Sequence, residues 1–101
     1  MPTHSLTIRF KYPKADMEPL YELEEKLAEA LEEADAGDYE GVEMAMSGKE
    51  GEMVMTGPDA HALWEAVQPV LEAARFMRGA DAELRLGEGE HAETEEMTVG
   101  S

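Results

Sequence analysis

Four methionines in two alternating pairs are the residues best suited to metal chemistry. One residue separates Met44 from Met46, and one separates Met53 from Met55. Thioether sulfurs bind Cu(I), and two such pairs on neighbouring strands could converge on one ion. The same alternation places all four on the buried face of a sheet, where flexible methionines fill irregular gaps. We therefore expect core packing and predict no metal or other cofactor, with a Cu(I) site as the alternative.

His61 is the histidine best placed for a cation site. Asp59 precedes it by two residues and Glu65 follows it by four, so carboxylates and an imidazole gather at one helix end. Surface histidines near acids are common, however, and such pairs contribute only about 0.2–0.5 kcal/mol. We expect a solvated helix terminus. His4 and His91 fall in segments that we expect to fray.

Glutamates between residues 17 and 35 are the third candidate. Like charges four residues apart, such as Glu18 and Glu22, cost helix stability. Selection for solubility, particularly in a halophile, explains such acidity without a function. The functional interpretation is a surface that resembles a phosphate array and binds a basic protein, as inhibitors, immunity proteins and nucleic-acid mimics do. The residues predicted to form it are Glu18, Glu22, Glu25, Glu29 and Glu32.

Other chemistry finds little support in the sequence. The absence of cysteine excludes a disulfide scaffold, a thiolate zinc site, an iron–sulfur cluster and a cysteine nucleophile. There is no nucleotide-binding glycine loop, no Gly-x-Ser-x-Gly elbow and no His-Glu-x-x-His motif. Residues 13–16 lack the glycine that an acylphosphatase-like anion loop needs. We predict no catalytic residues and a protein that is not an enzyme.

Charge sets the partner class. The 101 residues include 24 acids and 8 Lys or Arg, for a formal charge of −16. Nucleic-acid affinity depends on cations that replace counterions, so we expect no direct binding of DNA or RNA and no adsorption to anionic membranes. No apolar run approaches the ~20 residues of a membrane span, and residues 1–12 lack the apolar stretch of a signal peptide. We expect a soluble, cytoplasmic protein.

Hydrophobic alternation predicts the strands. The period of two covers residues 6–12, 42–46, 53–56 and 82–86, and a turn joins the middle two segments into a hairpin. Pro13 ends the first strand because proline cannot continue a ladder. The side chains expected to face the helices are Leu6, Ile8, Phe10, Val42, Met44, Met46, Met53, Met55, Leu84 and Leu86.

Two helices separate these strands. Apolar spacing predicts the first from Met17 to Asp35, with Asp16 as its N-cap and Gly37 as a left-handed stop. The second begins at Pro58 and Asp59 and extends to Gly79, and Pro69 lies away from its apolar stripe, so we expect a kink and not a break. That stripe comprises Ala60, Leu63, Trp64, Val67, Leu71 and Ala74, which we assign to the core.

The element order β-α-β-β-α-β favours an α+β fold, the ferredoxin-like split βαβ sandwich. In it, a four-stranded antiparallel sheet carries both helices on one face, with the first and third strands central. Residues 1–87 would form this single domain and residues 88–101 an acidic, solvated tail. The alternative makes residues 87–89 a turn and pairs residues 94–99 back onto the sheet as an edge strand.

A resemblance to a known family rests on a further set of residues. They are Asp38-Tyr39-Glu40-Gly41, Gly57-Pro58-Asp59-Ala60, Leu63, Val67, Pro69-Val70-Leu71 and Arg78-Gly79-Ala80. Over about residues 15–87, this pattern resembles an uncharacterised family of small bacterial α+β proteins with a GPDA-x2-L-x3-V-x-PVL helix motif. The resemblance implies a compact domain and a bacterial source and supplies no activity. Met53 and Met55 depart from the aromatic residues that the family often has in this strand.

Two functional hypotheses follow. The first is a non-enzymatic, acidic interaction domain whose first-helix glutamates bind a basic protein. The alternative is a regulatory module that senses a small ligand held between its open sheet face and a second subunit. The chain would be a monomer or a homodimer, and the second hypothesis requires the homodimer.

Overall fold

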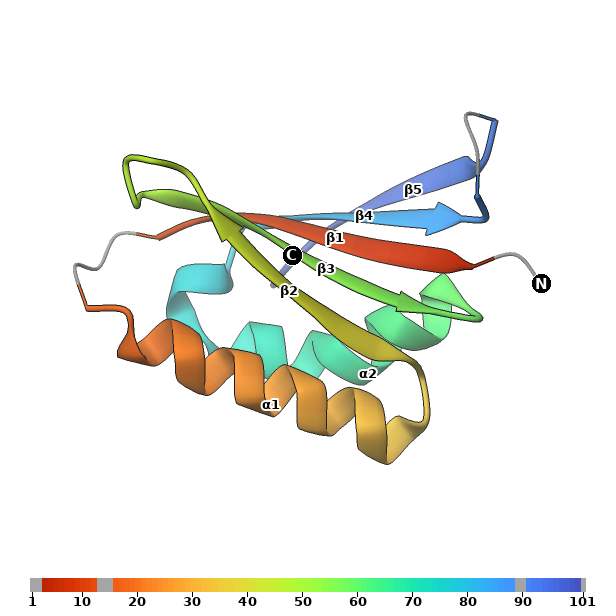
Figure 1. The fold of residues 1–101 in the computed structure, drawn as a ribbon, viewed down its shortest axis with the longest axis horizontal. Helices are drawn as coiled ribbons and strands as arrows, with labels where there is room; N and C mark the ends of the chain where they lie inside the picture. Colours follow the sequence, from red (N-terminus) through yellow and green to blue (C-terminus); the bar gives the residue numbers. More distant parts are fainter. Residues whose placement is uncertain (1–2, 13–15, 89–90, 101) are drawn as a thin grey trace.

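The computed structural model describes residues 3–12, 16–88 and 91–100, and these form one sheet covered by helices on one face (Figure 1). The elements are β1 His4–Lys11, α1 Glu18–Ala34, β2 Asp38–Met44, β3 Glu50–Gly57, α2 Ala60–Ala73, the 3₁₀ turn η1 Arg75–Met77, β4 Asp81–Leu86 and β5 Glu93–Thr98. The sheet order is β2-β3-β1-β4-β5, with every pairing antiparallel. This α+β order is compatible with the predicted ferredoxin-like sandwich.

The prediction of four strands was wrong, because β5 pairs along β4 as a fifth strand in the described residues. Two apolar side chains attach it: Met97 lies opposite Ala82, and Val99 is buried. Beyond the strand, Val99 N–H donates to the carbonyl of Ala80 at 3.0 Å and Gly79 N–H donates to the carbonyl of Val99 at 2.9 Å. The edge-strand alternative for residues 94–99 therefore describes this segment. Its predicted turn at 87–89 includes a residue outside the described part of the chain.

The helix α1 begins and ends slightly differently from the prediction. Met17 is its N-cap, while Asp16 contributes a side-chain acceptor for the N–H of Glu18 at 3.0 Å. At the other end the helix stops at Asp35, which adopts the left-handed conformation with φ 51°, and Gly37 follows two residues later with a positive φ of 153°. A Cβ on Gly37 would lie 2.1 Å from the carbonyl oxygen of Thr56. Gly37 is therefore needed for close packing of the chain against the end of β3.

The helix α2 is shorter than predicted. Asp59 is its N-cap and accepts from the N–H of His61 at 3.0 Å, but the helix ends at Ala73 and Ala74 is extended. The chain then turns through η1, which brings Phe76 against the ring of Tyr12 at a centroid separation of 5.1 Å. His4, expected to fray, is part of β1, and its Nδ1 accepts from the N–H of Ala60 at 3.0 Å.

The core lies between the sheet and the helices, as predicted, and one assigned residue does not belong to it. Met46 is fully exposed because β2 ends at Met44 and the hairpin turn has already begun, with the N–H of Gly48 donating to the carbonyl of Ala45. Met53 and Met55 are completely buried, and Met44 is partly buried against the core. The remaining predicted core positions of the strands are buried or pack against the buried cluster.

Pro13, predicted to end the first strand, lies outside the described residues, and β1 ends at Lys11. Neither helix in the described part of the chain has both the length and the apolar character needed to cross a bilayer.

Candidate functional site

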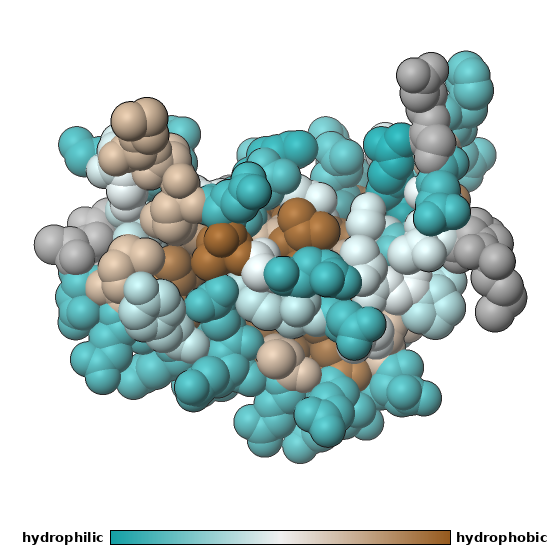
Figure 2. All heavy atoms as spheres, in the orientation of Figure 1, coloured by the Kyte–Doolittle hydropathy of each residue, from teal (hydrophilic) through white to brown (hydrophobic). Residues whose placement is uncertain are grey.

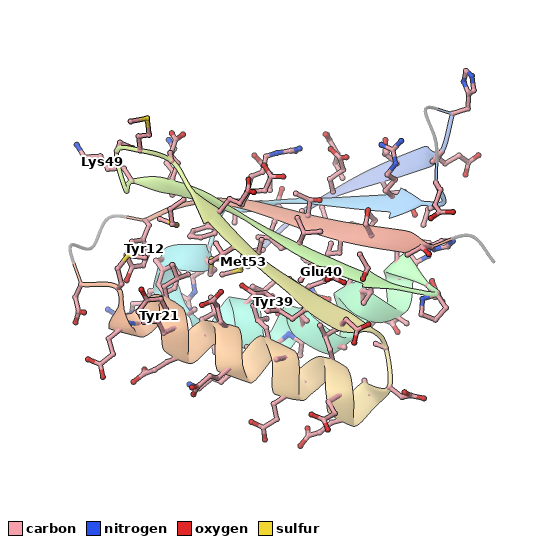
Figure 3. The ribbon with its side chains drawn as sticks, in the orientation of Figure 1. Tyr12, Tyr21, Tyr39, Glu40, Lys49 and Met53 are labelled. Carbon is pink, nitrogen blue, oxygen red and sulfur yellow. The ribbon has the colours of Figure 1, made fainter. Side chains whose placement is uncertain are left out.

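The five glutamates predicted to bind a partner are all exposed on α1. At about 100° per residue they occupy a stripe of roughly 80° around the helix. The buried residues Leu20, Leu23, Leu27 and Leu31 lie on the opposite side of the helix. Glu18, Glu22, Glu25, Glu29 and Glu32 therefore point away from the sheet, into the solvent. Figure 3 shows side chains of α1 that project away from the sheet. We call these five residues the glutamate stripe.

A groove of about 600 Å³ runs along one flank of this stripe, between α1 and α2. Its apolar lining comes from both helices and η1: Pro19, Leu23, Ala30, Pro69, Val70, Ala73, Ala74 and Phe76. Its charged lining is Glu22, Lys26, Glu29 and Glu33 of α1 and Arg75 of η1. Only part of the glutamate stripe borders this groove: Glu22 and Glu29 line it, and the other three glutamates do not.

Glu33 lines the groove although the sequence analysis did not assign it to the site. Its helical position, four residues after Glu29 and eleven after Glu22, puts it on the same flank of α1. Periodicity alone could have found that flank, but the position of α2 beside it could not be known. Pro69, predicted to lie away from the apolar stripe of α2, is exposed and lines the other side of the groove.

The helix α1 is held to the sheet edge by a polar contact. The hydroxyl of Tyr39 in β2 donates to Oε1 of Glu24 at 2.7 Å. Burial of the phenol, and secondly its bond to this carboxylate, raise the pKa of Tyr39 well above its ordinary value of 10.0. The hydroxyl of Tyr12 donates to the carbonyl of Asp16, and burial raises the pKa of Tyr12 as well. Both phenols are therefore neutral hydrogen-bond donors in the folded protein.

His61 does not assemble the cation site that the sequence offered as an alternative to a solvated helix terminus. Its ring lies 3.8 Å from Asp59 and 2.5 Å from Glu95 of β5, and the contact with Glu95 was not predicted. No group of three or more histidines and carboxylates arranged to hold a metal ion occurs within the described residues. The methionine alternative fails for a different reason, because Met46 is exposed in the turn while Met53 and Met55 are buried inside the sheet. The helix terminus is exposed, as expected, and its histidine also contacts the edge strand.

The open face of the sheet is predominantly acidic. Arg9 at its centre lies 3.3 Å from Glu83 and 3.7 Å from Glu52. Two pairs of like charges lie directly opposite each other on neighbouring strands, Glu43 with Glu52 and Glu83 with Glu96. Such pairs are unfavourable and would become more so if two copies of this face were brought together. This charge argues against a dimer that holds a ligand between two open faces.

A second depression, of about 620 Å³, lies at the end of β1 beside the β2–β3 hairpin. Its apolar wall includes Phe10, Met44 and Phe76. Its charged residues are Arg9, Lys11 and Arg78 together with Glu43, Glu50, Glu52 and Asp81. Three cations and four carboxylates thus line this depression.

Figure 2 shows hydrophilic residues over most of the lower side of the molecule, where α1 lies, with apolar residues between the helix and the strands above it. Comparison of the chain with family models, with curated proteins and with solved structures found no match. The resemblance to the small bacterial family stays a prediction.

Proposed function

We propose that this protein is a non-enzymatic interaction domain that binds a basic protein through the glutamate stripe of α1. The observation that carries the proposal is the position of the stripe, directly opposite the buried leucines and exposed along its length. Like charges at four-residue spacing destabilise a helix, and α1 contains a single cation, Lys26, to offset them. This loss of helix stability is explained if the stripe binds a partner whose positive charges offset the repulsion between the glutamates.

The physics of such a contact is mainly electrostatic steering. An array of exposed carboxylates raises the rate of encounter with a cationic surface and gives less to the final affinity. Salt weakens the effect, because exposed charges are screened beyond ~10 Å at 0.1 M ionic strength. A partner held in this way associates quickly at low salt and is released as the salt concentration rises.

The proposal is tested with two variants of equal charge. One replaces Glu22, Glu25 and Glu29 with glutamine, and the control replaces Glu88, Glu93 and Glu96, which are exposed outside the helices. Glu95 is left intact because it contacts His61. Immobilised wild-type protein and both variants are exposed to a lysate of the cells that encode the chain, and retained proteins are quantified by mass spectrometry along a salt gradient.

We expect at least one basic protein that the wild type and the control variant retain and that the helix variant loses. It should elute as the salt concentration rises, and its purified form should associate more slowly with the helix variant. Equal losses from the two variants would mean that only net charge is recognised. The acidity of α1 would then serve solubility, and the proposal would be rejected.

A further inference from the structure

We propose that the groove between α1 and α2 binds an amphipathic helix of the basic partner, with the apolar side of that helix on the groove floor and its cations against Glu22, Glu29 and Glu33. This inference rests on the proposed function and assigns the form of the partner. The groove joins an apolar floor from both helices to a charged rim, in which Glu22, Glu29 and Glu33 of α1 outnumber the cations Lys26 and Arg75. Neither a purely polar nor a purely apolar segment matches both surfaces.

The dimensions of the groove suit a helix. Its lining on α1 extends from Pro19 to Glu33. At 1.5 Å per residue these fourteen steps span about 21 Å, the length of roughly four helical turns. Small side chains, Ala30 on α1 and Ala73 and Ala74 on the other side, lie in its lining. They permit the interaxial distances of 8–10 Å that are typical of packed helices.

The charges of the rim indicate which end of the groove attracts the cations of the partner helix most strongly. The rim carboxylates Glu22, Glu29 and Glu33 are separated by seven and four residues, or about 10 and 6 Å along the axis. Glu29 and Glu33 lie close to the C-terminal end of α1, where the helix dipole is negative and no basic residue occupies the last turn. Both cations of the lining lie toward the other end of the groove: Lys26 precedes Glu29 on α1, and Arg75 follows the end of α2, which runs opposite to α1 (Figure 1). The strongest attraction for a cation is therefore near Glu29 and Glu33.

Other occupants fit less well. A second copy of this chain would bring another acidic α1 against the same carboxylates, and the formal charge of −16 repels such an approach. The C-terminal segment of the chain is already paired as β5 and is itself acidic. A separate protein with a basic, amphipathic helix can contact both the apolar floor and the carboxylates of the rim.

The test uses a fluorescein-labelled 18-residue peptide of leucine, alanine and lysine. Its leucines recur at heptad spacing on one side, and its lysines flank them. A scrambled peptide of identical composition has the same charge and no apolar side. Binding to the full chain is measured by fluorescence anisotropy at 0.1 M salt. Four double variants accompany the wild type: V70Q/A73Q in the floor, A28Q/A34Q on exposed positions of α1 outside the groove, E22Q/E29Q in the rim, and E88Q/E96Q on exposed positions outside the helices.

We expect the amphipathic peptide to bind the wild type at least tenfold more tightly than the scrambled peptide. V70Q/A73Q should bind the two peptides equally, and A28Q/A34Q should keep the wild-type preference. Circular dichroism should show that both variants unfold at the wild-type temperature. The rim variant should weaken both peptides. If a floor variant fails to fold, Val70→Gln alone replaces it.

The remaining outcomes separate the two proposals. Equal binding of the two peptides, weakened by E22Q/E29Q, would overturn the groove and leave the electrostatic function standing. A preference for the amphipathic peptide that survives V70Q/A73Q would also overturn the groove. Losses no larger for E22Q/E29Q than for the control E88Q/E96Q would reject the proposed function itself and, with it, the assignment of cations to the rim.

Discussion

The hydroxyl of Tyr39 in β2 and the carboxylate of Glu24 in α1 are joined by a 2.7 Å hydrogen bond, which ties the sheet edge to the proposed binding helix. Within the sheet, β2 pairs only with β3, so its other side depends on contacts such as this one. The bond also occupies Glu24, which therefore faces β2 while its neighbour Glu25 faces solvent. One helix thus carries one structural glutamate and several free to meet a partner.

Replacing Tyr39 with phenylalanine should destabilise the fold by about 1 kcal/mol, because the bond is lost and Glu24 is left without its donor. Urea unfolding at neutral pH gives the change. Glu24→Gln preserves an acceptor oxygen and should cost less than Tyr39→Phe. Tyr21→Phe is the matched control, since that side chain is exposed and should change stability little. A Tyr39→Phe protein as stable as the wild type would show that the contact contributes nothing.

Alkaline pH should destabilise the wild type more than Tyr39→Phe. The pKa of Tyr39 is raised in the folded state, so above the ordinary value of 10.0 the unfolded chain loses this proton first. The stability due to the neutral phenol is complete below pH 10 and falls as the pH rises further. Unfolding midpoints in urea at pH 8, 10 and 11 test this difference. Tyr12 contributes a similar slope to both proteins, because its pKa is also raised, and parallel pH profiles would contradict the prediction for Tyr39.

Truncating the methionines should separate core from surface. Met53→Ala and Met55→Ala should each cost ~2–5 kcal/mol because both side chains are fully buried. Met46→Ala should change stability by less than about 0.5 kcal/mol, since that side chain is exposed. Thermal unfolding measures all three. Stoichiometric Cu(I) should leave the melting temperature of the wild type unchanged, and a large increase would revive the thioether site.

Attachment of β5 should depend more on Val99 than on the contact between His61 and Glu95. Val99→Ala should cost about 2 kcal/mol, because buried methyl groups are removed. Glu95→Gln should cost less than about 1 kcal/mol, since both partners of that contact are substantially exposed. Hydrogen exchange of the β5 amides, compared with β1, reports local opening of the edge. Faster exchange in Glu95→Gln than in Val99→Ala would reverse this ranking.

Gly37→Ala should be among the most damaging small substitutions, at roughly 3 kcal/mol or more. The added Cβ would meet the carbonyl of Thr56 at 2.1 Å and the Cα of Gly57 at 2.9 Å, and backbone cannot easily move aside. Gly48→Ala is the control: its φ is also positive, at 73°, but nothing lies within 4 Å of the new atom. It should cost about 1–2 kcal/mol from the left-handed conformation alone. Equal losses would mean that the close approach relaxes.

The elements with strong periodicity could be predicted from the sequence, and those defined by long-range contacts could not. The stripe of α1 and the alternation of β1 carry enough apolar residues to specify type and face without a partner. In β5 only Met97 is apolar, and its value depends on Ala82 lying opposite. Because β5 has so few apolar residues, its pairing becomes favourable only when the rest of the sheet has placed β4.

Ends of elements were also decided by packing. The periodicity of α2 continues to Gly79, yet the helix ends at Ala73 because the chain must turn to place Phe76 against Tyr12 and bury Met77. Likewise Met46 continues the alternation of β2 but lies in the hairpin turn. The candidate site was likewise predictable only in part. The exposure of its glutamates could be predicted from the helical period, whereas the groove beside Glu22 and Glu29 could not, because it depends on where α2 packs.

The central place of β1 affects how the chain can fold while it is being synthesised. Of the five strands described, this one is made first, but its neighbours are β3 and β4, so His4 pairs with Gly57 and Ser5 with Arg85. At 5–20 residues per second, translation from β1 to the end of β3 takes about 2–10 s, and the second neighbour comes later still. During that interval the apolar side of β1 has no sheet to join. The nascent protein is therefore most dependent on chaperones before its hairpin has left the ribosome, and the high charge of α1, which is made next, keeps this early segment in solution.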